Sequence, residues 1–318
     1  MIRSLFFFFV SMSVSFAEVQ TPMEKFIVSD GAELAYVDEG TPRLGTIVFV
    51  HGGPGYHSAY LRGFASSIKD DFRTILYDQR GSGLSSRTVK ESSITLDRYV
   101  EDLYEFLVDR KAEDIILLGQ SFGGAVVLEY VLAHPDGVQK VILENGYADA
   151  RISMEDRLNG AFELCKEKNI PVAEAVVQKY REGHPLSLDD LGKLTGDDVH
   201  ELYWYASNAE RLEFIEGGGE RWGYTKEALS EVGWIVERFW DQGLFTSYSV
   251  LYELHKINTP VLVVTGRHDK VISPRHAKEV ARRLPQSQLL ILEKSGHYPH
   301  IEEPKKFRRI IYEFAEIE

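Results

Sequence analysis

The feature that most constrains the fold is a sharp turn with a serine at its tip. The apolar run at residues 114–118 predicts a strand, residues 119–123 read Gly-Gln-Ser-Phe-Gly, and residues 124–130 predict a helix. Glycines two positions before and after Ser121 are needed because a side chain at either place would collide with the strand or the helix. The pattern therefore presents Ser121 on a strand-to-helix turn, where the positive end of the helix points at it.

Strand and helix patterns alternate through the first half of the chain. Continuous apolar runs, typical of strands buried on both faces, lie at residues 46–50, 72–77, 115–118 and 138–143. An antiparallel hairpin is predicted at 25–28 and 33–37, and a helix at 96–111. Such alternation implies right-handed crossovers, so it predicts an α/β fold with a mostly parallel central sheet flanked by helices.

The pattern changes between residues 150 and 245. Short apolar runs give way to charged, helix-like segments at 154–168, 172–181, 197–214 and 226–240. Buried-strand patterns return at 260–265 and 287–292, and an amphipathic helix closes the chain at 307–314. We therefore expect a core made of residues 23–149 and 246–318, with residues 150–245 inserted as a helical cap.

Two loops after later strands carry residues that could activate Ser121. A serine needs a histidine to take its proton and a carboxylate to orient that histidine. Asp269 follows the predicted strand at 260–265, and His297 follows the one at 287–292. Open α/β sheets gather their active sites at the carboxyl ends of strands. We assign Ser121 as the nucleophile, His297 as the general base and Asp269 as the orienting acid.

Three other residues compete for the roles of acid and base. Glu144 follows the strand at 138–143, where some members of this fold carry their acid. His300 comes one turn after His297 without a glycine beside it, and His268 precedes the acid. Neighbouring side chains of an extended segment point opposite ways, which disfavours His268 as a partner for the residue next to it.

The negative charge that forms on the substrate oxygen requires backbone N–H donors. The residue after the nucleophile, Phe122, supplies one such donor. A glycine-rich loop at residues 51–55, His-Gly-Gly-Pro-Gly, follows an early strand and lets the backbone approach a bound oxygen closely. We place the second donor at Gly53, with Gly52 as the alternative, and interpret His51 as a structural histidine that holds this loop.

A second glycine-containing loop spans residues 78–85. Its Asp78 and Arg80 could be mistaken for a catalytic carboxylate and an anion clamp. Structural support of the neighbouring glycine loop is the interpretation we favour. The glycine spacing could also suggest phosphate binding, but no Lys-Ser or Lys-Thr follows it.

Five segments together closely resemble the proline iminopeptidase family of α/β-hydrolases. They are residues 51–55, 78–83, 119–124, 266–269 and 296–297. The resemblance implies an α/β-hydrolase fold with a helical cap, a catalytic set of Ser121, Asp269 and His297, no metal and no organic cofactor. The implied reaction is release of an N-terminal proline from a peptide.

The sequence departs from this family where substrate would be selected. Family aminopeptidases usually have tryptophan after the nucleophile, and they bind the free amino group of the substrate with cap glutamates, one commonly in a Trp-Glu pair. Here that residue is Phe122, and Trp204 is followed by tyrosine. Glu213 and Glu216 share a helical face and, with Trp204, are our candidates for substrate binding. A solvated acidic helix face is the alternative interpretation of the glutamates.

The sequence therefore predicts a serine hydrolase acting on a small molecule or a short peptide. An aminopeptidase is the first choice, and a carboxylesterase or amidase acting on small esters is the second. A non-catalytic small-molecule receptor on the same fold is a third, which the intact nucleophile, acid and base disfavour. The net charge of −13 comes without a basic stripe, so nucleic acid is not expected as a partner.

The N-terminus has the pattern of a secretory signal. Arg3 precedes an almost wholly apolar run at residues 5–14, and Ser15-Phe16-Ala17 places small residues at the cleavage positions. The run is short for a membrane span, so we expect no stable span in the mature chain. We predict a signal peptide at residues 1–17, cleaved after Ala17, and an exported, periplasmic or secreted protein. An uncleaved N-terminal anchor is the alternative.

Overall fold

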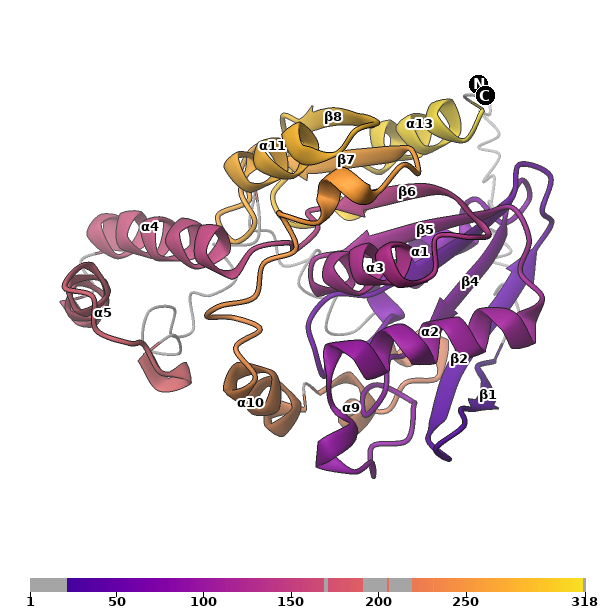
Figure 1. Ribbon diagram of the computed structural model, residues 1–318, viewed down its shortest axis with the longest axis horizontal. Coiled ribbons are helices and arrows are strands. Elements are labelled where there is room, and N and C mark those ends of the chain that lie inside the picture. The colour runs from indigo at the N-terminus through magenta and orange to yellow at the C-terminus, as the bar shows by residue number, and fades with distance from the viewer. Residues whose placement is uncertain (1–21, 169–170, 191–204, 206–218, 231, 317–318) are drawn as a thin grey trace, which may run out of the picture.

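One eight-stranded sheet forms the centre of the molecule (Figure 1). The computed structural model describes residues 22–168, 171–190, 205, 219–230 and 232–316. In sheet order the strands are β1 (Glu24–Ile27), β2 (Glu33–Gly40), β4 (Arg73–Tyr77), β3 (Thr46–Val50), β5 (Ile115–Gln120), β6 (Val138–Glu144), β7 (Val261–Gly266) and β8 (Ser287–Leu292). Strands β1 and β2 form an antiparallel hairpin, and β2 also runs antiparallel to β4. The remaining neighbours in this order, from β4 through β3 and β5 to β8, pair parallel.

Helices cover both faces of this sheet. Successive residues of a strand point to opposite faces, so on β3 Val48 joins one hydrophobic cluster and Phe49 the other. The first cluster includes side chains of α2 (Leu96–Arg110), α3 (Phe122–Ala133) and α11 (Pro274–Arg283). The second includes side chains of α1 (Ala59–Ser66) and α13 (Pro304–Ala315). The predicted α/β-hydrolase fold, with its mostly parallel sheet and flanking helices, is confirmed.

The chain leaves the sheet after β6 and returns to it at β7. Between β6 and β7, the described residues form helices α4 (Ala150–Lys168), α5 (Pro171–Arg181), α9 (Lys226–Leu229) and α10 (Gly233–Asp241). Short helical turns lie at η1 (Glu91–Ser93), η3 (Glu220–Trp222) and η4 (Leu254–Lys256), and α12 spans Pro299–Glu302. Figure 1 shows α4 and α5 projecting beyond the edge of the sheet at the left. Apart from Tyr205, the helix predicted at 197–214 lies outside the described residues.

The prediction of a single helix over residues 226–240 is wrong. Helix α9 ends at Leu229, and α10 begins again at Gly233. Between them, the N–H of Val232 donates to the carbonyl oxygen of Gly55 at 2.9 Å. Because Gly55 belongs to the glycine-rich loop of the core, the break in the helix serves a contact between the core and the inserted segment.

The outgoing and returning connections of the insertion run side by side. Ala150 N–H donates to Tyr248 O at 2.8 Å, and Val250 N–H donates to Ala148 O at 3.0 Å. His276 of α11 is fully buried beside them, and its Nε2 accepts the N–H of Ala148 at 3.2 Å. Burial lowers the pKa of His276 to about 4, because the charged imidazolium would lose its hydration.

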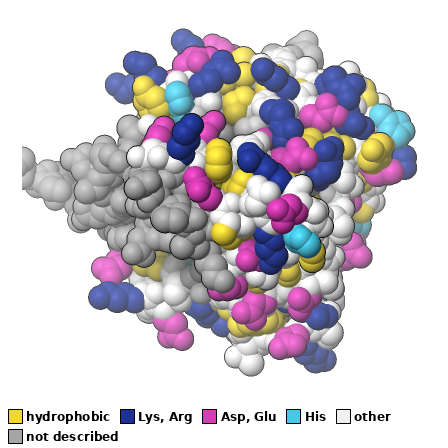
Figure 2. Space-filling view, turned by 90° about the vertical axis from the view of Figure 1, so that its left-hand side faces the viewer, with side chains coloured by type: hydrophobic (Ala, Val, Ile, Leu, Met, Phe, Trp, Pro, Cys, Tyr) yellow, Lys and Arg dark blue, Asp and Glu magenta, His cyan; other side chains and the backbone are white. Residues whose placement is uncertain are grey.

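The surface at the end of the molecule that carries the insertion is mixed in charge. On the face drawn in Figure 2, Lys and Arg side chains lie interspersed with Asp and Glu side chains, and hydrophobic side chains show as separate spots. Within the described residues, no helix combines the length and the hydropathy that crossing a membrane requires.

We expect the buried neutral state of His276 to weaken the fold in acid. Its pKa is about 4 in the folded protein and about 6.5 in an unfolded chain. Between these values the unfolded state binds more protons, so stability falls as the pH drops from 6.5 towards 4. From pH 7 to pH 5 this one group should remove about 2 kcal/mol of unfolding free energy. Denaturant titrations at both pH values should therefore show a smaller difference for His276→Gln than for the wild type; an equal difference would contradict this.

Candidate active site

Ser121 lies at the tip of the turn between β5 and α3 with a strained backbone. Its φ of +51° and ψ of −121° are costly for a residue with a side chain, at about 1–3 kcal/mol. A Cβ on Gly123 would lie 2.0 Å from the carbonyl oxygen of Val50, and one on Gly119 would lie 2.6 Å from Gly123 O. The turn predicted from the five-residue motif is therefore present, and the backbone around Gly119 and Gly123 leaves no room for a side chain at either position.

Asp269 and His297 meet at the carboxyl ends of β7 and β8. His297 Nδ1 donates to Asp269 Oδ2 at 2.6 Å, and both side chains are buried. The other carboxylate oxygen, Oδ1, accepts the N–H groups of Val271 and Ile272 at 2.7 and 2.9 Å. The amide of Asn145 also donates to Oδ2. A carboxylate held by this many donors is a fixed acceptor, which selects the imidazole tautomer with its proton on Nδ1 and makes Nε2 the basic nitrogen.

A chain of buried hydrogen bonds connects this histidine to the turn and to the glycine-rich loop. Gln120, which precedes Ser121, donates from Nε2 to the carbonyl oxygen of His297 at 3.1 Å. Its Oε1 accepts the hydroxyl of Tyr60 at 2.7 Å, and that hydroxyl accepts the N–H of Gly52 at 2.6 Å. Neither Gln120 nor Tyr60 was predicted from the sequence as a residue of the site. A buried polar side chain at the end of a strand otherwise made of apolar residues was the available signal.

The glycine-rich loop closely approaches Ser121. A Cβ on Gly52 would lie 2.6 Å from the Cβ of Ser121, so only glycine fits there. The N–H of Gly52 is occupied by Tyr60, which leaves Gly53, with its left-handed φ of +64°, as the better candidate for the donor to a substrate oxygen. Phe122 begins α3, where N–H groups have no partner within the helix. The assignment of Gly53 and Phe122 as donors stays a prediction.

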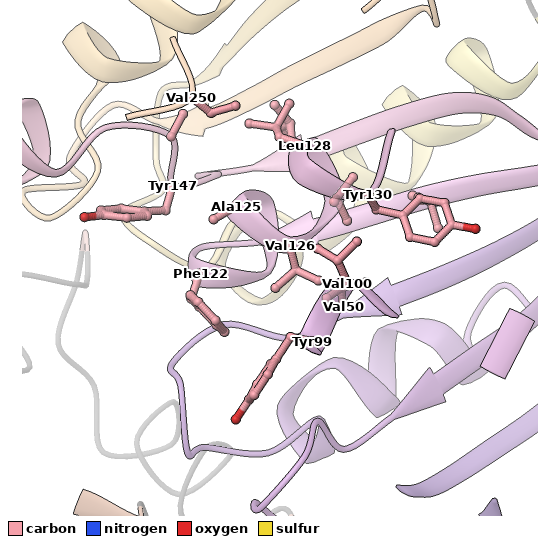
Figure 3. Close-up of a cluster of buried hydrophobic side chains, with 14 of the residues drawn as sticks. Val50, Tyr99, Val100, Phe122, Ala125, Val126, Leu128, Tyr130, Tyr147 and Val250 are labelled. Carbon is pink, nitrogen blue, oxygen red and sulfur yellow. The ribbon is translucent and has the colours of Figure 1, made fainter. Parts of the chain in front are cut away.

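The side chain of Phe122 packs into the core and against the inserted segment. Its ring centroid lies 6.0 Å from that of Tyr99 on α2 and 5.3 Å from that of Phe239 on α10. Figure 3 shows Phe122 and Tyr99 extending to the same side of α3. With 3% of its surface exposed, the Phe122 ring joins the core to the insertion.

Two of the alternative candidates, Glu144 for the acid and His300 for the base, are hydrogen-bonded to each other. Glu144 Oε1 accepts both the backbone N–H and Nδ1 of His300, at 2.9 and 2.7 Å. His268 is on the surface, where its Nε2 lies 3.2 Å from the carbonyl oxygen of Glu293. Each of the three residues thus has a partner outside the Asp269–His297 pair.

His51 and the loop at 78–85 support the glycine-rich loop. His51 is fully buried and accepts the N–H of Gln79 at 3.0 Å, and burial lowers its pKa. Asp78 Oδ1 accepts the N–H of Ser58 at 2.7 Å and the hydroxyl of Tyr224 at 2.9 Å. The carboxylate therefore ties the segment after the glycine-rich loop to the insertion.

Arg80 anchors the same loop to α2 by a buried ion pair. It donates to both carboxylate oxygens of Asp102 at 2.8 and 2.7 Å, and to Asp30 at 2.8 Å. A bidentate arrangement of this kind fixes direction as well as distance. These contacts agree with the structural role expected for Asp78 and Arg80.

The three candidates for substrate binding, Trp204, Glu213 and Glu216, lie outside the described residues. Tyr205, which is described, donates its N–H to Glu302 Oε1 at 2.8 Å. Within the described part of the chain, no three His, Cys, Asp or Glu side chains are grouped so that they could hold a metal ion.

Comparison with known proteins gives a consistent result. The family profile described as alpha/beta hydrolase fold matches residues 45–304. The proline iminopeptidase of Heyndrickxia coagulans is 27% identical over 92% of this chain and 98% of its own length. That of Clostridioides difficile is 29% identical over 87% of this chain and 92% of its own length.

Solved structures with the same fold include peptidase relatives and esterases. A proline iminopeptidase-related protein from Thermus thermophilus matches with a TM-score of 0.70 and 26% identity, over 92% of this chain and 97% of its own. An esterase from Exiguobacterium antarcticum matches with a TM-score of 0.67 and 18% identity, over 92% and 99%. Because the family profile spans most of its length, the chain belongs to the α/β-hydrolase family. Its similarity over nearly the whole chain to proline iminopeptidases identifies it as a hydrolase.

Proposed function

We propose that this hydrolase is a serine aminopeptidase that releases N-terminal proline from peptides. The observation that carries the proposal is the 2.6 Å contact between His297 Nδ1 and Asp269 Oδ2, together with the hydrogen bond from Gln120, the residue before Ser121, to the carbonyl oxygen of His297. The curated relatives named proline iminopeptidase, which align over nearly the whole chain, support the choice of substrate.

In the proposed reaction, His297 Nε2 takes the proton of the Ser121 hydroxyl as its oxygen attacks the prolyl carbonyl carbon. The Asp269 carboxylate stabilises the imidazolium that results. The N–H groups of Gly53 and Phe122 bind the oxygen that becomes negative. His297 then gives the proton to the leaving amine, so the C–N bond breaks and an acyl-enzyme forms. Water, deprotonated by His297, attacks this ester. The bond between the acyl carbon and the Ser121 oxygen then breaks, His297 returns its proton to that oxygen, and proline leaves with a free carboxylate.

A carboxylesterase or amidase acting on small substrates is the second candidate. The same nucleophile, base and acid would perform ester hydrolysis, since an alkoxide is an easier leaving group than an amine. Two departures from the peptidase pattern favour it: Phe122 stands where tryptophan is usual, and no Trp-Glu pair occurs between residues 150 and 245. The free amino group of a peptide would then lack its usual carboxylate partner in the cap.

The proposed catalytic roles of Ser121, His297 and Asp269 can be tested by covalent labelling of the protein and by the kcat of variants. A fluorophosphonate probe should label the wild type and not Ser121→Ala. Asp269→Asn should lower kcat by about four orders of magnitude, because the amide disfavours the required tautomer. Full activity in Asp269→Asn with loss in Glu144→Gln would reverse the assignment of the acid. An unlabelled wild type would favour a receptor over an enzyme.

Chromogenic substrates should separate the two candidate activities. We expect the protein to release naphthylamine from prolyl-naphthylamide with a kcat/KM above that for acetyl-nitrophenyl ester. Robust turnover of the ester with none of the amide would contradict the peptidase proposal and support the esterase. Ser121→Ala, assayed in parallel, shows how much of either signal belongs to this site.

We also propose that the protein is exported and that residues 1–17 are removed. N-terminal sequencing of protein recovered from a secreting host should then begin at Glu18. A sequence beginning at Met1 would instead indicate an uncleaved anchor.

A further inference from the structure

Glu144 contacts both the nucleophile turn and the loop that carries His297. Its backbone carbonyl oxygen accepts the N–H of Ser121 at 3.1 Å. Its side-chain Oε1 accepts the backbone N–H and Nδ1 of His300 at 2.9 and 2.7 Å. Within the described residues, the second polar atoms of the pair, Glu144 Oε2 and His300 Nε2, make no hydrogen bond. The hydrogen bonds between Glu144 and His300 therefore connect β6 directly to α12.

Helix α12 in turn holds the loop before His297. Glu302 Oε2 accepts the N–H of Gly296 at 2.5 Å. The next carboxylate, Glu303, accepts the N–H of Lys294 and the hydroxyl of Ser295, both at 2.8 Å. Because His300 lies on the same short helix, fixing His300 against β6 also fixes the segment that ends at His297.

The Glu144–His300 pair lies in an apolar and aromatic environment. The ring of His300 lies 5.8 Å from that of Tyr60 on α1, and 6.3 Å from those of Phe64 and Phe307. Glu144 and His300 have 0% and 3% of their surfaces exposed. Two described titratable groups interact with Glu144. They are His300 on α12 and Tyr60 on α1, and the pKa of Tyr60 is raised by burial and by the Glu144 charge. In such surroundings a carboxylate is retained only with a good partner.

We propose that Glu144 and His300 form a positioning pair that sets the location of His297 relative to Ser121. The inference rests on the proposed serine hydrolase function. Neither residue is assigned contact with substrate; the pair acts through α12 and through the backbone of the nucleophile turn. A displacement of about 1 Å between catalytic groups can reduce the rate about 100-fold, so a pair that fixes this distance influences kcat more than substrate binding.

The test removes the side-chain hydrogen bond between Glu144 and His300 by changing His300, and weakens it by changing Glu144. His300→Leu eliminates the donor and should lower kcat about 100-fold with KM within about threefold. His300→Asn places an amide N–H near the position of Nδ1 and should restore most of the rate. Glu144→Gln keeps an acceptor oxygen but loses its charge, and should lower kcat about tenfold at unchanged KM because the hydrogen bond is weaker. Exposed Glu293, paired with Arg267 at the same end of the sheet, gives the matched control Glu293→Gln.

Rates are measured as turnover of the chromogenic substrate that the wild type hydrolyses and as the second-order rate of labelling by the fluorophosphonate. Thermal unfolding of each variant shows whether it folds.

Wild-type kcat in folded His300→Leu would overturn the inference, since the pair would then be merely structural. If His300→Leu does not fold, an unchanged kcat in Glu144→Gln overturns it. A Glu144→Gln that loses as much as Asp269→Asn and shifts the acid limb of the pH profile would make Glu144 the orienting acid. Failure of the wild type to react with the probe contradicts the proposed function instead.

Discussion

The strained backbone of Ser121 is the constraint on which the rest of the site depends. A φ of +51° is not stable by itself, and three backbone hydrogen bonds hold it. Ser121 N–H donates to Glu144, and its carbonyl oxygen accepts from Gly124 and Tyr147, both at 2.8 Å. Strand β6 with the segment after it, and the first turn of α3, thus hold the turn, and the absence of a Cβ at Gly123 allows α3 to approach β3.

Buried polar side chains transmit this geometry to the other loops. Gln120 connects the turn to the carbonyl oxygen of His297 and, through Tyr60, to the glycine-rich loop. Asp78 and Arg80 hold the neighbouring loop against the insertion and α2. Each of these groups has a partner far away in the sequence, so the site is built by the tertiary fold. A hydrophobic core could support the same strands but could not fix the direction of a loop in this way.

The parts of the molecule that sequence reasoning predicted are those with a local cause. Continuous apolar runs mark strands buried on both faces, and the glycines beside Ser121 mark a turn that no other residue permits. The hydrogen bond between Asp269 and His297 was also predictable, because both residues follow strands whose carboxyl ends lie side by side in the sheet. The pairing of Glu144 with His300, 156 positions apart, has no local signal. The contact at the break before α10 has no local signal either, since Val232 there donates to Gly55 in a distant loop. Trp204, Glu213 and Glu216, which are predicted to bind substrate, lie outside the described residues.

The contact between Val232 and Gly55 has a consequence for substitutions at the two positions. Both partners are backbone groups, so the attachment of the insertion to the glycine-rich loop does not depend on the side chain at position 232. The steric demand falls on the core, because a Cβ on Gly55 would lie 2.8 Å from the carbonyl oxygen of Val232. Substitution of the side chain at position 232 can therefore leave this hydrogen bond to the glycine-rich loop unchanged, whereas any side chain at position 55 would disturb it.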